Sequence, residues 1–383
     1  MAQGESTIPL KMLLFYFHAA NTVIVTFLPL YLQFRGLDGT EIGLVMAIGP
    51  FVSIFSQPFW GYMSDKSQSV KRILMLCLIG VLISSTFFLQ MATLPLLLTL
   101  GAAYYFFAAP IGALGDSLAQ RRADQLRVSF GTIRTWGSIG FATSSIIIGQ
   151  VLAMTGIQYM VWPYLVLAGA AFLTSTRLVD ANVKARPVQI RDMGSLMKKK
   201  PFIIFLGLIL FITTTHRAND SFIGIHIANL GGSEQLVGFA WFAGVASEAL
   251  VFATAGKWFQ KFHPLLFIIG AGLLFSIRWF LYAILADPAL IVGLQFLHGL
   301  TYGVFYLTAF SYVTSLIPKF LQATGHLVFV SVAFGVTGII GSLVGGIIMD
   351  NLGGESLYTY MGSTSATGVI LLLLYHILPY GKS

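Results

Sequence analysis

Twelve long apolar segments, separated by short polar loops, constrain this chain more than any other feature of its sequence. They cover residues 10–34, 40–63, 72–91, 94–119, 128–154, 158–177, 201–228, 235–257, 263–286, 289–316, 321–349 and 357–379. A helix needs about 20 apolar residues to cross the hydrocarbon core of a bilayer, and each segment reaches that length. Because 56% of the residues are hydrophobic and only 9% are charged, a water-soluble fold cannot bury the apolar surface. The sequence predicts an all-α membrane protein with twelve transmembrane helices, and runs of this length exclude an outer-membrane barrel.

The basic residues fall in alternate loops when the N-terminus is placed in the cytoplasm. The loops then expected inside hold Lys66, Lys71, Arg72, Arg121, Arg122, Arg127, Lys184, Arg186, Arg191, Lys198, Lys199, Lys200, Lys257, Lys261, Lys319 and Lys382. The outer loops keep one basic residue, Arg35, among several acids. This bias follows the positive-inside rule and predicts that both termini are cytoplasmic. It also accounts for the net charge of +8 without a nucleic-acid partner.

The long basic loop in the middle of the chain divides the twelve segments into six plus six. We expect an N-terminal six-helix bundle over 1–178, a cytoplasmic linker over 179–200 and a C-terminal six-helix bundle over 201–383. The two halves show a weak internal repeat, because the glycines at 43 and 61 recur at 238 and 256, an offset of 195 residues. Parallel repeats of six spans are one way in which secondary transporters are built.

A few charged side chains remain at membrane depth once the loops are assigned: Asp116, Arg134, Arg217, Asp220, Glu248 and Arg278, with His216 and His298 beside them. A charge at mid-helix costs about 2.5–3.5 kcal/mol on insertion scales, so such residues face one another or a watery cavity. Asp116 and Arg134 each lie nine residues from the turn near Gln125. They can therefore meet at one depth, and the arginine fork can grip a hydroxyl pair or a carboxylate. The alternative is a structural ion pair that joins two helices.

The second half offers a comparable set around the turn near Asp287. Arg278 precedes this turn by nine residues and His298 follows it by about ten, so they can share a level with Glu248. An arginine that approaches or leaves Glu248 changes how readily the carboxylate takes up a proton, and a histidine can relay that proton. Asp220 and His216 lie four residues apart on one helix face. The alternative for His298 is a histidine that only forms a hydrogen bond to a neighbour. The alternative for Asp220 and His216 is that they line a solvated cavity without binding a specific ligand.

Two softer candidates accompany the Asp116–Arg134 pair. Asn21 lies within the first span, where it can touch a solute or bond a neighbouring backbone. Phe141 follows Arg134 by seven residues, about two turns, so it shares that face. Its ring can stack on a solute, although core packing or lipid contact is the more common role of such a residue.

The segment GYMSDKSQSVKR over 61–72 resembles the loop signature that follows the second span in the major facilitator superfamily. Gly61, Asp65, Lys71 and Arg72 match or nearly match it, whereas the second glycine of the signature is missing. The resemblance implies an inner-gate loop. There Asp65 would cap a neighbouring helix N-terminus and bond a basic residue. A basic loop that only sets the orientation of the spans is compatible with the same residues.

Two further segments, TIRTWGSIGF and LQFLHGLTYG, are similar to the lactose permease, phenylpropionate permease and nucleoside-proton symporter branch of that superfamily. The resemblance implies that Asp116 and Arg134 bind substrate. It also implies that Glu248, Arg278 and His298 take part in substrate binding and proton coupling. Phe141 replaces the tryptophan on which galactosides stack in that branch.

The chain departs from this branch where lactose permease carries its proton. Thr301 stands in place of the main proton-carrying glutamate, and Gln295 in place of a lysine. Proton coupling by the same route is therefore in doubt, and Glu248 or Asp116 would have to carry the proton.

Taken together, the residues and the resemblance predict a secondary active transporter of the bacterial cytoplasmic (inner) membrane that works by alternating access. We expect proton symport of an aromatic carboxylate, a nucleoside or a saccharide, with Asp116, Arg134, Phe141, Asn21 and His298 at the solute. The expected proton-coupling residues are Glu248, Arg278, His298 and Asp220. The alternatives are a proton-coupled drug or metabolite exporter and a non-transporting sensor.

No enzyme, cofactor or metal site is predicted, because the chain lacks the H-E-x-x-H and G-x-S-x-G signatures. The single cysteine, Cys77, lies in an apolar run and is expected to serve packing. The expected partners are a small-molecule solute, protons and the lipid bilayer, and the chain is expected to be monomeric.

Overall fold

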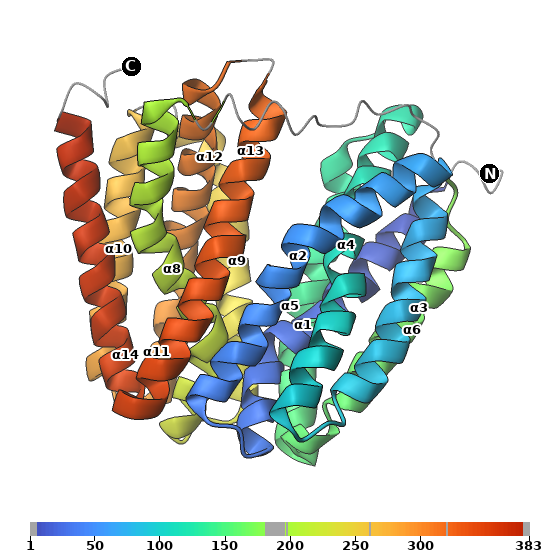
Figure 1. The fold of residues 1–383 in the computed structure, drawn as a ribbon, viewed down its shortest axis with the longest axis horizontal. Helices are drawn as coiled ribbons and strands as arrows, with labels where there is room; N and C mark the ends of the chain where they lie inside the picture. The colour runs from blue at the N-terminus through green and yellow to red at the C-terminus, as the bar shows by residue number, and fades with distance from the viewer. Residues whose placement is uncertain (1–5, 181–195, 197, 260–261, 319–320, 378–383) are drawn as a thin grey trace. The chain divides into compact units, whose positions relative to one another are not determined.

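The computed structural model describes residues 6–180, 196, 198–259, 262–318 and 321–377. All regular elements in this part of the chain are helices (Figure 1).

The helices of the first half form a continuous series with short connections. They are α1 (Ile8–Phe34), α2 (Gly39–Ser67), α3 (Val70–Phe88), α4 (Leu94–Leu126), α5 (Phe130–Thr155), a 3₁₀ turn η1 (Ile157–Tyr159) and α6 (Val161–Thr176). Proline lies in the first turn of α1 and α4, where its missing N–H is not needed. Ser69 caps α3 by accepting a hydrogen bond from the backbone N–H of Arg72 at 3.1 Å.

The second half is less regular. Its helices are α8 (Lys200–Asn229), α9 (Glu234–Trp258), α10 (Pro264–Ile284), α11 (Pro288–Leu294), α12 (Val304–Leu316), α13 (Gln322–Val330) and α14 (Thr337–Ile377). A 3₁₀ turn, η2 (Gln295–Leu297), and a π-helical segment, η3 (Gly299–Gly303), lie between α11 and α12. A second π-helical segment, η5 (Ser331–Val336), joins α13 to α14.

Eleven helices in the described residues are long and apolar enough to cross a membrane. The last of them, Thr324–Ile377, contains 54 residues and breaks at Gly353, where φ is 78°. Glycine adopts this φ at low cost, so the helical backbone can be interrupted at this position. The interruption divides α14 into two spans. The predicted all-α fold with twelve transmembrane helices is confirmed, although the last two spans follow each other without the loop expected around 350–356.

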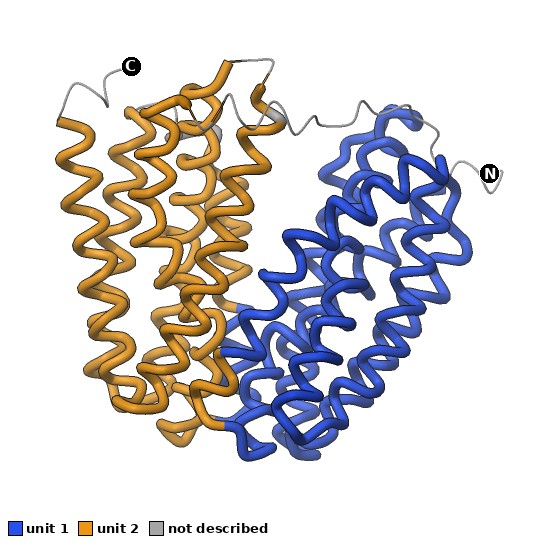
Figure 2. The backbone as a smooth tube through the Cα atoms, in the orientation of Figure 1, with its two compact units in different colours: residues 1–37, 44–187, 233–242 blue, residues 38–43, 188–232, 243–383 orange. Residues whose placement is uncertain are grey.

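The chain forms two compact units (Figure 2). Unit 1 contains 1–37, 44–187 and 233–242, and unit 2 contains 38–43, 188–232 and 243–383. The units differ from the expected halves at two places, because the first turns of α2 belong to unit 2 and those of α9 to unit 1. Residues 181–195 of the predicted linker, together with Lys261, Lys319 and Lys382, lie outside the described residues.

Close helix packing within each unit depends on small residues. In unit 1, α5 approaches α1 so closely that a Cβ on Gly140 would lie 2.2 Å from the Phe15 carbonyl oxygen. In unit 2, a Cβ on Gly341 of α14 would lie 2.7 Å from the Thr214 carbonyl oxygen of α8. Such approaches are typical of helices that associate in lipid, where dispersion contacts replace the hydrophobic effect.

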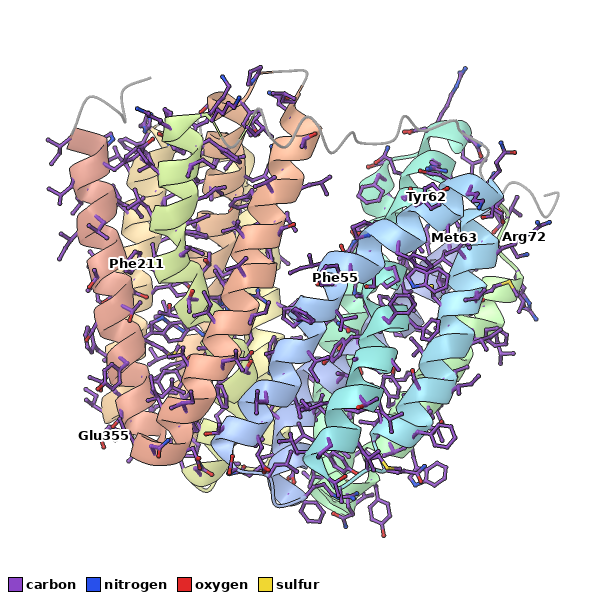
Figure 3. All side chains as sticks on the ribbon, in the orientation of Figure 1. Phe55, Tyr62, Met63, Arg72, Phe211 and Glu355 are labelled. Atoms are coloured by element: carbon purple, nitrogen blue, oxygen red, sulfur yellow. The ribbon has the colours of Figure 1, made fainter. Side chains whose placement is uncertain are left out.

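The exterior is apolar as well as the core. Phe55 and Tyr62 of α2, both labelled in Figure 3, are 62% and 63% exposed. A soluble protein would not leave this much large apolar surface in contact with water.

Candidate functional site

In unit 1, the polar centre is the pair formed by Asp116 of α4 and Arg134 of α5. The Arg134 Nε lies 2.9 Å and 3.1 Å from the two carboxylate oxygens of Asp116, and donates a hydrogen bond to Oδ2. The side chains are 33% exposed for Arg134 and 38% for Asp116. No other hydrogen bond of the Arg134 guanidinium is found in the described part of the chain. Its terminal amino groups therefore remain available to a ligand.

The space for this guanidinium depends on Gly137 and on His18 of α1. A Cβ on Gly137 would lie 2.7 Å from Arg134 Nη1 and 2.6 Å from His18 Cδ2. The Nε2 atom of His18 is buried and has no hydrogen-bond partner in the residues described. A buried polar atom without a hydrogen-bond partner lowers the stability of the fold unless a ligand or a water molecule bonds to it.

Asn21 and Phe141 complete the predicted set in unit 1. Asn21 is half-buried on α1, and we find no side-chain hydrogen bond for it among the described residues. The Phe141 ring lies 6.0 Å from the ring of Trp241, which belongs to the first turns of α9. The sequence did not point to Trp241, because nothing local indicates that this part of α9 packs on α5.

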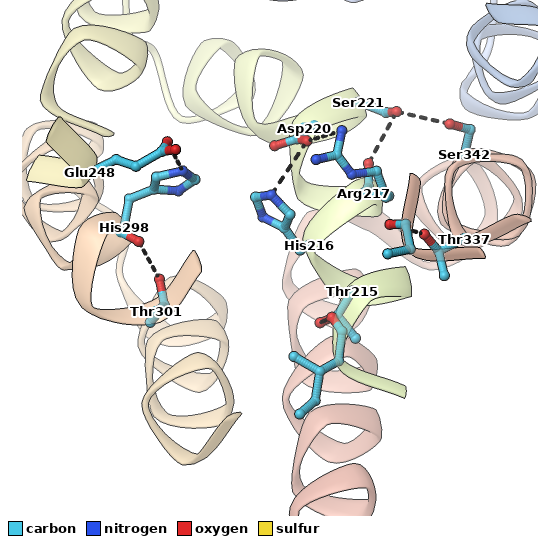
Figure 4. Close-up of polar contacts among 12 residues, drawn as sticks. Thr215, His216, Arg217, Asp220, Ser221, Glu248, His298, Thr301, Thr337 and Ser342 are labelled. Atoms are coloured by element: carbon cyan, nitrogen blue, oxygen red, sulfur yellow. Dashed lines mark hydrogen bonds and ion pairs between the residues drawn. The ribbon is translucent and has the colours of Figure 1, made fainter. Parts of the chain in front are cut away.

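In unit 2, α8 carries a second acid–arginine pair (Figure 4). The Asp220 Oδ2 atom lies 3.0 Å from Arg217 Nη1 and 3.7 Å from His216 Nε2. The guanidinium of Arg217 also lies over the ring of Phe334, 4.7 Å from its centroid. Asp220 therefore lies within 4 Å of both an arginine and a histidine.

Glu248 of α9 and His298 form the other charged contact of unit 2, with His298 Nε2 3.7 Å from Glu248 Oε2 (Figure 4). The ring of His298 lies 5.4 Å from that of His216, and both lie beside the ring of Tyr302. Tyr302, which the sequence did not single out, stacks on His216 at 4.3 Å. The two carboxylates and two histidines thus form one titratable cluster within unit 2.

Arg278 departs from the expected arrangement with Glu248. It is fully buried and donates hydrogen bonds to Tyr282 Oη at 3.1 Å, to Thr301 Oγ1 at 3.2 Å and to Gln295 Oε1. No carboxylate forms an ion pair with it in the described residues. The neutral side chains at 295 and 301 provide the acceptors that a buried guanidinium requires, which explains why Arg278 packs against them rather than against Glu248.

The sequence was compared with those of known protein families, and this comparison identifies the class of protein to which the two polar clusters belong. Residues 7–360 match the family described as MFS_1 like family. The chain belongs to this family. It is accordingly a member of the major facilitator superfamily, as the loop and span signatures predict.

Known relatives agree with this assignment. This MFS protein is 29% identical to the uncharacterized transporter YwbF of Bacillus subtilis, over 91% of the chain and 88% of the relative. It is 26% identical to the maltose permease of Geobacillus stearothermophilus, over 97% and 95%. The solved structure of the nucleoside transporter NupG shares its fold, with a TM-score of 0.86, 18% identity and full coverage of both chains. The protein is a multi-pass secondary transporter that handles small molecules in a membrane.

Contacts with Asp180 and Thr176 hold the end of the predicted inner-gate loop of this transporter. Lys71 donates its backbone N–H to Asp180 Oδ1 at 3.0 Å, and its Nζ to the Thr176 carbonyl oxygen at 2.7 Å. The Ser69 hydroxyl also donates to Asp180. Asp180 therefore joins the end of α6 to the start of α3. Nothing local in the sequence points to this residue, because it lies over 100 positions from its partners.

Asp65 lies in the last turn of α2. Its side chain is exposed, and no hydrogen bond or ion pair of its carboxylate is found in the described part of the chain. A Cβ on Gly61 would meet nothing within 4 Å, and Arg72 is exposed on the first turn of α3. The N-cap of α3 is Ser69, which directly precedes the helix.

Proposed function

We propose that the protein is a proton-coupled symporter that imports a small hydroxylated solute by alternating access. The observation that carries the proposal is the Asp116–Arg134 pair, the acid–arginine ion pair that the described residues of unit 1 place within membrane-spanning helices. Arg134 uses its Nε on the carboxylate and keeps its terminal amino groups free. A pair that served only to join two helices would need no free donors, and an apolar contact would join them at lower cost.

The charge of this pair favours a neutral solute over an anionic one. Asp116 already balances Arg134, so a carboxylate on the solute would approach a second carboxylate without gaining a free positive charge. A vicinal hydroxyl pair can accept from the guanidinium and donate to Asp116 at once. A saccharide or the ribose of a nucleoside has this pattern. We rank both above an aromatic carboxylate.

The comparisons support the same solute classes. The relatives include a maltose permease, and the fold matches that of a nucleoside transporter. Half-buried Phe141, with Trp241 beside it, supplies an aromatic surface on which a sugar or base ring can stack. We propose Asn21 and His298 as additional polar contacts to the solute.

We assign proton coupling to the titratable cluster of unit 2. Glu248 with His298, and Asp220 with His216 and Arg217, each pair a carboxylate with a basic group at less than 4 Å. Protonation of either carboxylate breaks such a pair and thereby links proton uptake to side-chain rearrangement. In this proposal, Arg278 holds η2 and η3 in place and so positions His298, rather than exchanging a proton with Glu248.

The remaining predictions concern the architecture of transport. We propose that 1–178 and 201–383 are the functional domains, with 179–200 as their cytoplasmic linker. The loop with Gly61, Asp65, Lys71 and Arg72 would act at the inner gate. We further propose that the protein works as a monomer in a bacterial cytoplasmic membrane, with both termini inside.

A transport assay with a matched control tests the proposal. Right-side-out vesicles under an inward proton gradient should accumulate labelled maltose or uridine in preference to 3-phenylpropionate. Arg134→Lys keeps the charge but loses the planar fork, so we expect uptake to fall at least tenfold. Arg35→Lys, at an arginine that bonds Tyr31 Oη and the Gln90 carbonyl oxygen, should transport normally. Equal uptake by both variants would remove Arg134 from the site.

The direction of transport needs a separate measurement. Loss of a preloaded solute under the same gradient would favour the exporter alternative. Solute binding to the purified protein without movement across liposomes would favour a sensor. Solute-induced alkalinisation of the external medium, lost in Glu248→Gln, is the result expected for symport.

A further inference from the structure

An apolar groove in unit 2 is separate from the polar clusters described above. Its volume is about 530 Å³, within the range of roughly 300–1,000 Å³ typical of small-molecule sites. It lies where α9, α10 and the junction of η3 with α12 meet. The walls include Val251, Leu266, Gly270, Ala271, Leu300 and Val304.

The lining restricts what the groove can hold. Among the described residues that line it, Thr254 is the one polar side chain, and its hydroxyl donates to the Leu250 carbonyl oxygen at 2.9 Å within its own helix. A saccharide or nucleoside would lose its hydrogen bonds to water here without replacement. The groove therefore suits hydrocarbon and not the transported solute.

The groove is continuous with apolar surface on the same helices. At its rim, Leu266 is 44% and Leu300 48% exposed. Leu250 on α9 and Leu273 on α10 are also exposed. In a chain that spans a membrane, the hydrocarbon of the bilayer covers such a surface favourably.

We propose that this groove holds one acyl chain of a membrane phospholipid. Gly270 lines the groove, and a Cβ at this position would meet no atom within 4 Å, so the missing side chain leaves room along the wall. A flexible chain can follow a narrow apolar groove that a rigid ring cannot, and each buried methylene adds to the affinity.

The bound chain would pack behind the Glu248–His298 contact. A Cβ on Gly303 of η3 would lie 3.5 Å from both Glu248 Cγ and Val251 Cγ1, so α9 and η3 are in close contact at the inner wall. The acyl chain thus supports the two elements that carry the pair. The lipid site itself does not depend on the proposed function.

Photolabelling with a lipid probe tests the inference. The protein is reconstituted in phosphatidylethanolamine and phosphatidylglycerol vesicles with phosphatidylethanolamine that carries a diazirine midway along one acyl chain. Labelled residues are then counted by mass spectrometry. We expect Leu266 and Leu300 to be labelled at least fivefold more than Leu290, which is also exposed but lies on α11 outside the groove.

A filled groove provides the matched comparison. Gly270→Phe should reduce labelling at Leu266 and Leu300 at least fivefold. Gly293→Phe on α11 should not, although this glycine also has nothing within 4 Å of a Cβ. Equal labelling of all three leucines in the unaltered protein would show only a general lipid coat and would overturn the proposal. Cross-links between two copies of the chain at the groove would overturn it as well. The comparison within the unaltered protein needs no variant, so it holds even if Gly270→Phe fails to fold.

Discussion

At the scale of single residues, Arg278 shows how this protein holds a buried charge without a carboxylate partner. Its acceptors are the side chains of Gln295, Thr301 and Tyr282. Gln295→Leu removes one of them and leaves a charged donor unsatisfied, so we expect a loss of about 1–3 kcal/mol in the free energy of unfolding. Gln295→Glu restores an acceptor and should be milder. The melting temperature of the purified protein measures both.

A control for Gln295→Leu is available on α2. Gln57 is exposed and makes one long hydrogen bond, 3.5 Å, to the Ala109 carbonyl oxygen. Gln57→Leu should change the free energy of unfolding by less than about 0.5 kcal/mol. If the two leucine variants had the same melting temperature, the hydrogen bond between Gln295 and Arg278 would not contribute measurably to the free energy of unfolding.

His263, which precedes the first turn of α10, predicts a pH dependence of stability. Its Nδ1 accepts a hydrogen bond from the Leu265 N–H at 3.3 Å, and its ring lies 5.4 Å from that of His376. Burial, together with nearby His376, lowers the pKa of His263 below its ordinary value of 6.5. The unfolded chain therefore takes up this proton more readily than the folded one. The contribution of His263 to stability is full above pH 6.5 and declines as the pH falls below that value.

Asparagine at position 263 separates capping from titration. His263→Asn can still accept from the helix N-terminus but carries no proton in this range. We expect its melting temperature to fall less than that of the unaltered protein between about pH 7 and pH 5. Identical slopes for the two proteins would mean that His263 does not contribute.

The candidate site shows which residue contacts the sequence can predict. Asp116 and Arg134 lie on either side of the connection between α4 and α5, and the structure brings them to 2.9 Å as predicted. The connection lies at 127–129 rather than near Gln125, so Asp116 is ten residues before the end of α4 and Arg134 four residues after the start of α5. Asp180 and Trp241 could not be found in this way, because their partners lie in distant helices. The contacts of Arg278 were misplaced for a related reason. Spacing gives the level of a side chain but not the direction in which it points.

At the scale of elements, the close packing of α5 on α1 makes a prediction about glycine. Gly140→Ala would place a methyl group 2.2 Å from the Phe15 carbonyl oxygen, and two backbones cannot separate without disturbing the helix pair. We expect a loss of about 1–3 kcal/mol, which is typical of overpacking. The readout is the melting temperature of the purified protein.

Gly169 of α6 is the matched control, since a Cβ there would meet nothing within 4 Å. Gly169→Ala should be neutral or stabilise by up to about 1 kcal/mol, because alanine favours the helix. The packing argument fails if Gly140→Ala is as stable as Gly169→Ala.

The π-helical segments mark the limit of element prediction. The apolar runs predicted helices through 289–316 and 321–349, which is correct in outline, but gave no sign of η3 or η5. In η3, the Gly299 N–H donates to Ser247 Oγ of α9 at 2.9 Å. Bulges of this kind depend on a tertiary partner and are often found at functional sites, and η3 directly follows His298, which we propose as a site residue.

At the scale of the whole molecule, the spans were predictable because the bilayer imposes a length and a composition on each of them. The exact bounds of the two compact units were harder to predict. Residues 38–43 and 233–242 belong to the unit opposite their sequence half. Gly43 and Gly238, which suggested the internal repeat, lie at or near these exchanged segments. Gly43 and Gly238 correspond to close backbone contacts, with a Cβ on Gly238 placed 2.2 Å from the Ser145 carbonyl oxygen, whereas a Cβ on Gly61 would meet nothing within 4 Å.

The orientation of the chain in the membrane is the last prediction, and it rests on charge alone. With the N-terminus inside, sixteen basic residues fall in inner loops and only Arg35 in an outer one. Reversal would require translocating the basic loops 178–200 and 64–72 against the positive-inside bias. A green fluorescent protein fused after residue 383 should therefore fluoresce, because it folds in the cytoplasm. Alkaline phosphatase inserted at Gly36, where φ is 89° and a Cβ would meet nothing within 4 Å, should be active only outside. Phosphatase inserted between 186 and 187 should be inactive, and the opposite pattern of the two insertions would reverse the assignment.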